Sequence, residues 1–261
     1  SDGGYALAGY TSSPNSSDFY LLKLNASGDS TWTKTHVVTG YGGARDAQQT
    51  TDGGYILAGY GNNDALIIKT NALGDTLWTR TYGDPVQQDI FEAVSQTTDG
   101  GYIFAGETQI TGLANEMYLV KTDANGDALW TKNYGGVGLQ KAWNVSQTSD
   151  GGYALVGSSF QTGNTIFVVK TDALGDTLWT NTYNGSGGFS IKETIDGGYV
   201  LVGNSITSHN LLIKTTATGT ELWRKEYANG QAREVHQTTD GGYIFAGATG
   251  INASNDMLID A

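Results

Sequence analysis

The sequence contains no cysteine, which excludes disulfide bonds, thiol catalysis and cysteine-ligated zinc. Basic residues are scarce as well, because 14 Lys and Arg stand against 26 Asp and Glu, for a formal net charge of −12. Such a chain repels phosphate backbones and has no polybasic surface for anionic lipid, so we expect no nucleic-acid partner. No apolar run approaches the roughly 20 residues that cross a bilayer, and we expect no membrane insertion.

Proline is almost missing too, with 2 residues, whereas glycine (38), tyrosine (15) and tryptophan (6) are plentiful. This profile is typical of many short strands joined by tight turns. Hydrophobic residues make up 38% of the chain, which is enough to bury a core, and 261 residues fit a single all-β domain.

The sequence is built from a repeat. Asp-Gly-Gly-Tyr occurs six times at intervals of 44 to 51 residues, and the units begin near residues 2, 45, 91, 141, 188 and 232. Periods of this size are typical of solenoids, arrays and propeller blades. The unit at 91–134 predicts four strands, over 91–98, 102–106, 117–122 and 128–134. The second and third of these are near-continuous apolar runs, as expected of strands covered on both faces.

A repeated four-stranded unit of this length predicts a β-propeller. A single such sheet exposes two apolar faces, and a radial arrangement buries each face against the next sheet. We therefore predict an all-β propeller of about six four-stranded antiparallel blades in one domain over 1–261, with incomplete first and last blades. Either six blades close into a ring or the chain is a segment of a longer protein, and an incomplete terminal blade offers an edge for self-assembly.

The turn between the third and fourth strands raises the question of a metal. Asp123, Asn125 and Asp127 alternate like the first ligands of a calcium loop. Two equivalent turns have leucine at the central position, however, whereas a glycine recurs at Gly28, Gly74, Gly126, Gly175 and Gly219. This pattern predicts a hairpin turn with a glycine bulge. We expect no metal, with Asp123 and Asp127 as the remaining candidates.

Two further residues recur with the turn. A tryptophan follows each turn glycine by four positions, at Trp32, Trp78, Trp130, Trp179 and Trp223. We interpret these as structural residues that dock on the neighbouring blade. The third strand of each of the first five units ends in a lysine, which we expect to pair with the aspartate of its Asp-Gly-Gly-Tyr turn.

Residues 5–35, YALAGYTSSPNSSDFYLLKLNASGDSTWTKT, resemble the bacterial β-propeller repeat of large secreted proteins (the SBBP type). The segment from the turn to the tryptophan is similar to the tryptophan-docking motif of pyrroloquinoline-quinone-type propellers. The resemblance implies a secreted or cell-surface protein of bacteria or archaea. No residues match the cofactor and calcium ligands of the quinoproteins, so we expect no cofactor.

Candidate binding residues lie where the units differ. Seven positions before the Asp-Gly-Gly-Tyr aspartates stand Arg45, Glu92, Trp143, Phe189 and Arg233. Lys141 and Asn144 lie beside Trp143, and the positions equivalent to Asn144 in other units have Asp46, Ser190 and Glu234. The binding candidates are Arg45, Asp46, Lys141, Trp143, Asn144, Phe189, Arg233 and Glu234. In a propeller these residues would surround the mouth of the channel. Trp143 and Phe189 would either stack on a sugar ring or plug the channel.

These observations leave three functions open. The first is a non-catalytic extracellular or cell-surface propeller, acting as a structural, adhesive or protein-interaction module whose partners are surface proteins or glycans. The second is a carbohydrate-binding, lectin-like propeller. The third is a glycosidase using Asp46 and Glu234. Glycosylation sequons occur at Asn15, Asn25, Asn144, Asn184 and Asn252.

Overall fold

The computed structural model describes residues 2–84, 86–110, 114–136, 138–161, 163–249 and 256–260. Within these ranges all regular structure is β-strand, and consecutive strands of each sheet pair antiparallel, so the predicted all-β fold is confirmed. No described segment forms a helix of the length and hydropathy needed to cross a membrane.

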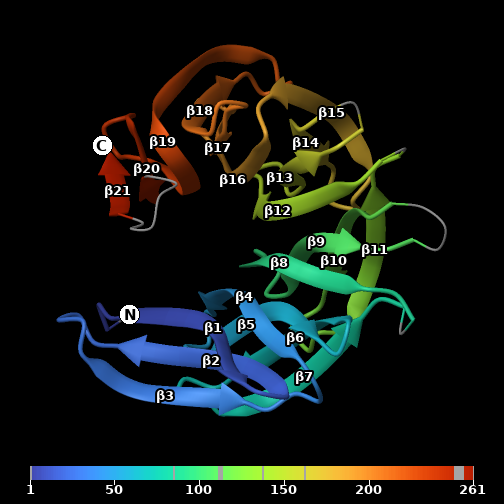
Figure 1. Ribbon diagram of the computed structural model, residues 1–261, viewed down its shortest axis with the longest axis vertical. Coiled ribbons are helices and arrows are strands. Elements are labelled where there is room, and N and C mark those ends of the chain that lie inside the picture. Colours follow the sequence, from blue (N-terminus) through green and yellow to red (C-terminus); the bar gives the residue numbers. More distant parts are fainter. Residues whose placement is uncertain are drawn as a thin grey trace. The chain divides into compact units, whose positions relative to one another are not determined.

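The chain divides into two compact units. The first comprises Ser1–Leu113 and Tyr118–Asn133, and holds the first three sheets apart from a few residues of the third. In chain order, their strands are β1 (Tyr5–Ser13), β2 (Ser16–Leu24) and β3 (Ser30–His36); β4 (Gly42–Gln49), β5 (Tyr55–Gly61), β6 (Asp64–Thr70) and β7 (Thr76–Tyr82); β8 (Asp89–Gln96), β9 (Tyr102–Thr108), β10 (Glu116–Thr122) and β11 (Ala128–Tyr134). Strands β4–β7 and β8–β11 form the expected four-stranded sheets (Figure 1).

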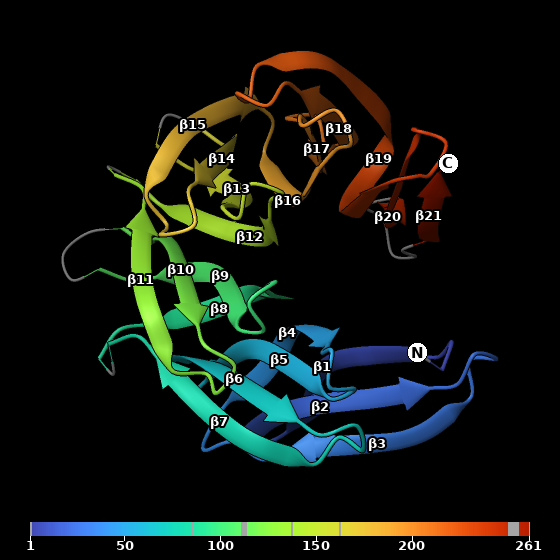
Figure 2. The same ribbon diagram turned by 180° about the vertical axis from the view of Figure 1, so that it is seen from behind.

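The second unit comprises Ala114–Met117 and Tyr134–Ala261. It contains β12 (Gln140–Gln147), β13 (Tyr153–Ser159), β14 (Thr165–Thr171) and β15 (Thr177–Asn184), followed by β16 (Gly187–Glu193), β17 (Tyr199–Asn204), β18 (His209–Thr215), β19 (Glu221–Gln237), β20 (Tyr243–Thr249) and β21 (Asp256–Asp260). Figure 2 shows the order of these strands from behind.

Strand β19 joins two sheets that the repeat pattern separates. Its first part pairs with β18, where Asn229 lies opposite His209, and its second part pairs with β20 from Gly230 onward. The strand therefore serves as the fourth strand of one repeat and the first strand of the next. The result is a six-stranded sheet of order β16-β17-β18-β19-β20-β21.

The core lies on the second and third strands of each repeat, as their apolar runs predict. In the first unit, Ile56 and Ile67 of one sheet pack with Phe91 and Phe104 of the next. In the second unit, Val156 and Val168 pack with Leu201 and Ile213, among other residues. The first strands of consecutive sheets lie side by side, in the pairs β4 with β8, β12 with β16, and β16 with β19. Facing sheets thus bury each other within each unit.

The first sheet is the exception, because it has three strands in the order β1-β2-β3. The side chains of Tyr5 and Leu7 are 59% and 51% exposed, whereas their equivalents Tyr55 and Leu57 in the second sheet are 2% and 0% exposed. Strand β1 therefore exposes apolar side chains whose equivalents in strand β5 are buried.

The predicted hairpin turn between third and fourth strands is confirmed. In the turn at 123–127 the amide of Gly126 donates to the carbonyl of Asp123, and Gly126 has a φ of +80°. The Asp123 carboxylate accepts the amides of Asn125 and Asp127 at 2.8 and 2.9 Å. The backbone amide of Asp127, followed by that of Asn125, lowers the pKa of Asp123. The side chain that resembles a calcium ligand thus stabilises the bend.

Candidate functional site

The five variable positions share a backbone feature that the sequence did not reveal. Each is the extra residue of a β-bulge in the first strand of its repeat, where the register with the second strand shifts. The shifts lie between Ala44 and Asp46, Phe91 and Ala93, Ala142 and Asn144, Gly188 and Ser190, and Ala232 and Glu234. The bulged residues are therefore Arg45, Glu92, Trp143, Phe189 and Arg233. A bulge redirects a side chain out of the regular ladder, and bulges are frequent next to binding sites.

Three bulged residues of the second unit come together with Lys141. The rings of Trp143 and Phe189 meet edge to face, with centroids 5.7 Å apart. The Lys141 ammonium lies 4.2 Å from the Trp143 ring centroid, and the Arg233 guanidinium carbon lies 4.7 Å from the Phe189 ring centroid. Each ring thus carries a cation near its face, an arrangement that electrostatic attraction to the ring quadrupole stabilises.

We call Lys141, Trp143, Phe189 and Arg233 the cation–aromatic cluster. One of its rings is fixed by a hydrogen bond, and one of its cations is exposed. The indole nitrogen of Trp143 donates to the Ser158 hydroxyl at 3.1 Å, which fixes the ring. Trp143 and Phe189 are half-buried, whereas Arg233 is exposed. The cluster therefore offers rigid aromatic surface and two positive charges on a chain whose net charge is −12.

The bulges of the first unit are charged. Arg45 lies 3.9 Å from the Glu92 carboxylate, and its guanidinium carbon lies 5.2 Å from the ring centroid of Tyr60. Arg45 is exposed, whereas the Glu92 side chain is only 8% exposed. The two units thus carry different chemistry at equivalent backbone positions.

Three of the residues that directly follow a bulge, Asp46, Asn144 and Ser190, bond to the first strand of the next repeat. The Asp46 carboxylate accepts the backbone amide of Val94, in the next sheet, at 2.9 Å. Asn144 accepts the amide of Ile191 in the same way, at 3.4 Å. The Ser190 hydroxyl accepts the amide of Val235 at 3.3 Å, a role that sequence reasoning missed because it considered Ser190 only as a variable position. These side chains fasten adjacent first strands to each other.

The proposed glycosidase pair is divided between the units, with Asp46 in the first and Glu234 in the second. Beyond its bond to Val94, Asp46 also accepts the amide of Ala47 at 2.8 Å. Glu234 lies 3.1 Å from the Lys192 ammonium and 3.5 Å from a ring nitrogen of His236. Both carboxylates therefore have protein partners. Within the described residues, no group of three or more His, Cys, Asp or Glu side chains is arranged to hold a metal ion.

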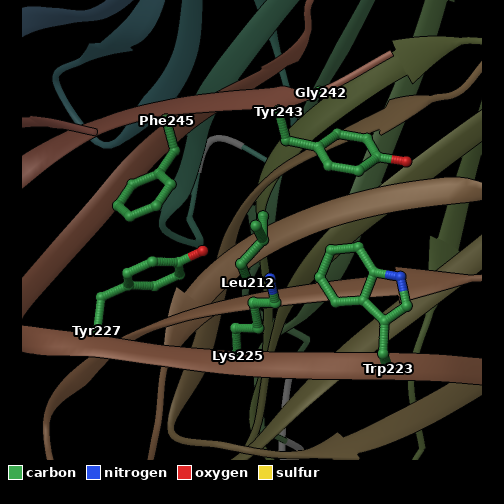
Figure 3. A pocket seen from close by; sticks show the side chains of 7 residues that line it. All are labelled: Leu212, Trp223, Lys225, Tyr227, Gly242, Tyr243 and Phe245. Carbon is green, nitrogen blue, oxygen red and sulfur yellow. The ribbon is translucent and has the colours of Figure 1, made fainter. Parts of the chain in front are cut away.

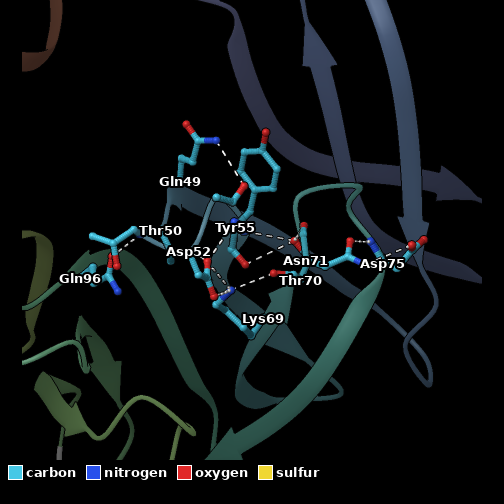
Figure 4. A network of polar contacts seen from close by, with 12 residues as sticks. Gln49, Thr50, Asp52, Tyr55, Lys69, Thr70, Asn71, Asp75 and Gln96 are labelled. Carbon is cyan, nitrogen blue, oxygen red and sulfur yellow. Dashed lines mark hydrogen bonds and ion pairs between the residues drawn. The ribbon is translucent and has the colours of Figure 1, made fainter. Parts of the chain in front are cut away.

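The predicted pairs between lysine and turn aspartate are confirmed. Lys69 lies 2.8 Å from Asp52, and the same pair is found as Lys23 with Asp2, Lys121 with Asp99, Lys170 with Asp150 and Lys214 with Asp196. Lys69 is almost completely buried, and its ammonium also donates to the Thr70 carbonyl at 2.8 Å (Figure 4). Partial burial acts to raise the pKa of Asp52, but hydrogen bonds from Lys69, Thr50 and Gly54 outweigh it and lower that pKa to about 2. These five pairs stabilise the turns to which they belong.

Three of the tryptophans, Trp32, Trp78 and Trp179, lie on turns of the following repeat. Trp32 meets Tyr55 edge to face at 5.8 Å, and a Cβ atom built on Gly74 would be 2.7 Å from its indole. Trp179 repeats both contacts, with Tyr199 at 5.7 Å and with Gly219. The recurring glycine therefore meets two requirements, a positive φ and room for an indole ring.

The sequons occupy different surroundings. Asn15 and Asn184 are exposed, and Asn144 is half-buried, with its side chain bonded to Ile191. The Asn25 side chain accepts the amides of Ser27 and Asp29 at 2.9 Å each. Asn252 lies outside the described residues. Glycosylation at these sites stays a prediction.

Comparison with known proteins shows the fold. No family model matches the sequence, and no curated protein matches it. Among solved structures, the chain is similar to the Dos1 propeller, with a TM-score of 0.58 and 10% sequence identity over 88% of this chain and 59% of that one. The chain thus spans about three fifths of the length of this neighbour. At this identity the similarity shows a β-propeller fold and no more, which confirms the predicted architecture.

Proposed function

We propose that the chain is a non-catalytic interaction module, in a secreted or cell-surface protein of the kind that carries SBBP-type propeller repeats. The observation that carries the proposal is the contrast between the bulges and everything else that recurs. Turn glycines, turn aspartates, lysines and tryptophans repeat from sheet to sheet and are used for turning, pairing or packing. The bulged residues do not recur in this way, because successive repeats have arginine, glutamate, tryptophan, phenylalanine and arginine there. Variable side chains on a rigid scaffold are where binding is usually found.

Within this proposal, the cation–aromatic cluster of the second unit is the binding site. Aromatic and arginine side chains are the most frequent anchors of protein interfaces, and Trp143, Phe189 and Arg233 supply both kinds. Hydrogen bonding to Ser158 and ring-to-ring packing hold the aromatic pair in place before a partner arrives, which reduces the entropy cost of binding. The exposed Arg233 favours a partner that presents carboxylates.

Carbohydrate binding is the second candidate, and the half-buried Trp143 favours it. Indole rings stack on the apolar face of a sugar, and the neighbouring Lys141 and Arg233 suit a uronic acid better than a neutral sugar. This candidate uses the same residues and differs from the first only in the class of partner.

Binding to a glycan array that carries neutral and uronate-containing oligosaccharides separates the two. Signal on acidic glycans that Trp143→Ala abolishes supports the lectin. No signal on any glycan, together with binding of immobilised acidic peptides by the native chain and weaker binding by Trp143→Ala and Arg233→Ala, supports the protein-interaction module. The Glu92→Gln variant is the control, because it changes a bulge of the other unit.

Two results would contradict the proposal. Equal binding by the native chain and Trp143→Ala on every probe would remove the cation–aromatic cluster as a site. Hydrolysis of a labelled oligosaccharide that is lost in the Asp46→Asn, Glu234→Gln double variant would show an enzyme instead.

A further inference from the structure

The first repeat differs from the others at the end of its fourth strand. Four positions after the recurring tryptophan the first repeat has His36, whereas the other fourth strands have a tyrosine, at Tyr82, Tyr134, Tyr183 and Tyr227. The first three of these tyrosines donate their hydroxyl to the carbonyl of the next repeat's turn glycine. Figure 3 shows the ring of Tyr227 beside that of Phe245, with centroids 5.1 Å apart. Tyrosine thus fills space between consecutive repeats, and the imidazole of His36 is smaller.

A cavity of about 430 Å³ lies beside His36 in the first unit. It is lined by the end of β3 and the residues that follow it, and by parts of β6 and β7. On its walls, Leu66 and Ile68 are 7% and 1% exposed, whereas Val37 is 83% exposed. The cavity therefore has buried apolar walls and an edge in contact with solvent, and its volume is typical of small-molecule sites.

Two buried polar atoms on the cavity walls have no hydrogen-bond partner among the described residues. The first is Nε2 of His36, a residue that is 8% exposed. The other ring nitrogen, Nδ1, is hydrogen-bonded to the Thr76 hydroxyl at 2.8 Å. Burial, followed by the positive charge of Lys34, lowers the pKa of His36, so the ring is neutral at neutral pH. A neutral imidazole whose Nδ1–H donates to Thr76 presents Nε2 as an acceptor.

The second atom is Oδ1 of Asp64. Asp64 begins β6 directly after the turn residues Asn62 and Asn63, whose φ values of +51° and +76° are those of a tight two-residue hairpin turn. In the first repeat the equivalent carboxylate, that of Asp18, accepts the amide of Val38 at 3.0 Å. An unpartnered carboxylate oxygen is therefore not imposed by this place in the repeat.

The charge of the cavity is negative. Among the described residues that line it, Asp64 is ionised at neutral pH and none is lysine or arginine. Lys34, two positions before His36, is paired with Asp75 at 2.7 Å. A buried acceptor without a donor costs free energy, and an N–H group of a ligand would remove that cost. The cavity therefore favours a ligand with a positive charge, more than one N–H and an apolar body.

We propose that this cavity binds a small organic cation that has a primary ammonium group on an apolar body. The N–H groups of the ligand donate to Asp64 Oδ1 and His36 Nε2, and its apolar body lies against Leu66 and Ile68. The site is independent of the cation–aromatic cluster, because the two share no residue and belong to different units.

Phenethylamine is the probe, with two matched analogues. Phenethyl alcohol lacks the charge, and phenethyltrimethylammonium keeps the charge but has no N–H. Calorimetric titration into the full chain should show saturable binding of one amine per chain. Both analogues should bind about tenfold more weakly, because hydrogen bonds between charged groups are about twice as strong as neutral ones. In a long-range nitrogen–proton spectrum the amine should shift the ring resonances of His36 and leave those of His209 and His236 in place.

Substitutions assign the binding to these residues. Asp64→Asn keeps the size of the side chain and should lower the affinity for phenethylamine about tenfold, with loss of the preference over the alcohol. Glu116→Gln is the matched control, because it neutralises the equivalent position of the next repeat, and it should leave the affinity unchanged. His36→Tyr introduces the residue of the other repeats. It should abolish amine binding, since the larger ring fills the cavity, without lowering the midpoint of thermal unfolding.

Three results would overturn the proposal. The first is the absence of saturable amine binding, since ordered water would then suffice for the two buried acceptors. The second is equal affinity for the amine and both analogues, which would show apolar adsorption alone. The third is amine binding that persists unchanged in Asp64→Asn and shifts His209 or His236 in place of His36.

Discussion

Trp78 of strand β7 lies against Gly126, a turn residue of the following sheet, so closely that a Cβ atom on Gly126 would be 2.7 Å from the indole. The two residues are 48 positions apart, close to the length of one repeat. The same strand contributes Tyr82, whose hydroxyl donates to the Gly126 carbonyl, and Arg80, which pairs with Asp127 at 3.4 Å. One short turn therefore receives a ring, a hydrogen bond and a charge from its neighbour.

Two glycines with the same backbone conformation distinguish the cost of a positive φ from the cost of displacing the indole. Gly126 and Gly100 have φ values of +80° and +84°, but no described atom of its own unit other than its chain neighbours lies within 4 Å of a Cβ built on Gly100. Alanine at either position should lower the free energy of unfolding by about 1–2 kcal/mol, because it must adopt a left-handed conformation. Gly126→Ala should cost about 1–3 kcal/mol more, because it also displaces the indole. Urea unfolding measures both, and equal losses would contradict the contact.

Removing the ring tests the same interface from the other side. Trp78→Ala should lower the free energy of unfolding by about 3–5 kcal/mol, since it leaves a cavity against Tyr102 and Gly126. The adjacent Leu77 is 57% exposed, and Leu77→Ala should change stability by less than about 0.5 kcal/mol. Thermal unfolding of the two variants gives the comparison. A small loss for Trp78→Ala would mean that the indole is not packed.

Acid stability depends on the pairs of lysine and turn aspartate. Partial burial acts to raise the pKa of Asp150, but hydrogen bonds from Lys170, Thr148 and Gly152 outweigh it and lower that pKa to about 2 from an ordinary value of 3.8. The carboxylate therefore stabilises the fold above about pH 4, and this contribution is lost as the pH falls towards 2. Four equivalent aspartates have the same pKa of about 2, so the native chain should lose stability steeply over this interval.

Lys170→Met tests the origin of that loss. The substitution keeps the volume of a buried side chain and removes its hydrogen bonds to Asp150, and it should cost about 1–2 kcal/mol at neutral pH. Stability of the variant should also fall less between pH 4 and pH 2 than that of the native chain. The exposed Lys225→Met serves as the control. An unchanged acid profile in Lys170→Met would show that the pair does not set the pKa.

Substitution of Asp46 tests whether this residue stabilises the fold or has a catalytic role. Its carboxylate accepts the amide of Val94, a residue that is 7% exposed, so Asp46→Ala leaves that amide without its acceptor and should cost about 1–3 kcal/mol. Asp46→Asn retains an acceptor oxygen and should cost less. Chemical unfolding of both variants ranks them, and a stable Asp46→Ala would argue that this residue is kept for another purpose.

Much of the fold follows from local sequence. The alternation of turn glycines and apolar runs predicted the strands, and the recurring lysine predicted its partner, because Lys170 and Asp150 belong to the same repeat and adjacent strands. Antiparallel pairing within one unit leaves few alternatives for such contacts. The turn at Asp123 was predictable for the same reason, since its hydrogen bonds span four residues.

Contacts between repeats were not predictable in the same detail. The sequence showed that position 143 varies, but the bulge that redirects Trp143 depends on the register between β12 and β13. Lys141 and Arg233 lie in different strands, and each lies near one ring of the Trp143 and Phe189 pair. The spacing of these residues along the sequence does not predict this arrangement. The double role of Gly126 was also hidden, because a turn alone already explains a glycine.

The central claim is that Gly74, Gly126 and Gly219 each pack against the indole of the preceding repeat, and ring-current shifts measure this directly. In a carbon–proton correlation spectrum of the native chain, one Hα of each of Gly74, Gly126 and Gly219 should lie upfield of the usual glycine range, since it points at an indole. Gly28 is exposed, and no described atom of its own unit other than its chain neighbours lies within 4 Å of a Cβ built on it, so it should show ordinary shifts. Ordinary shifts for all four glycines would contradict the account.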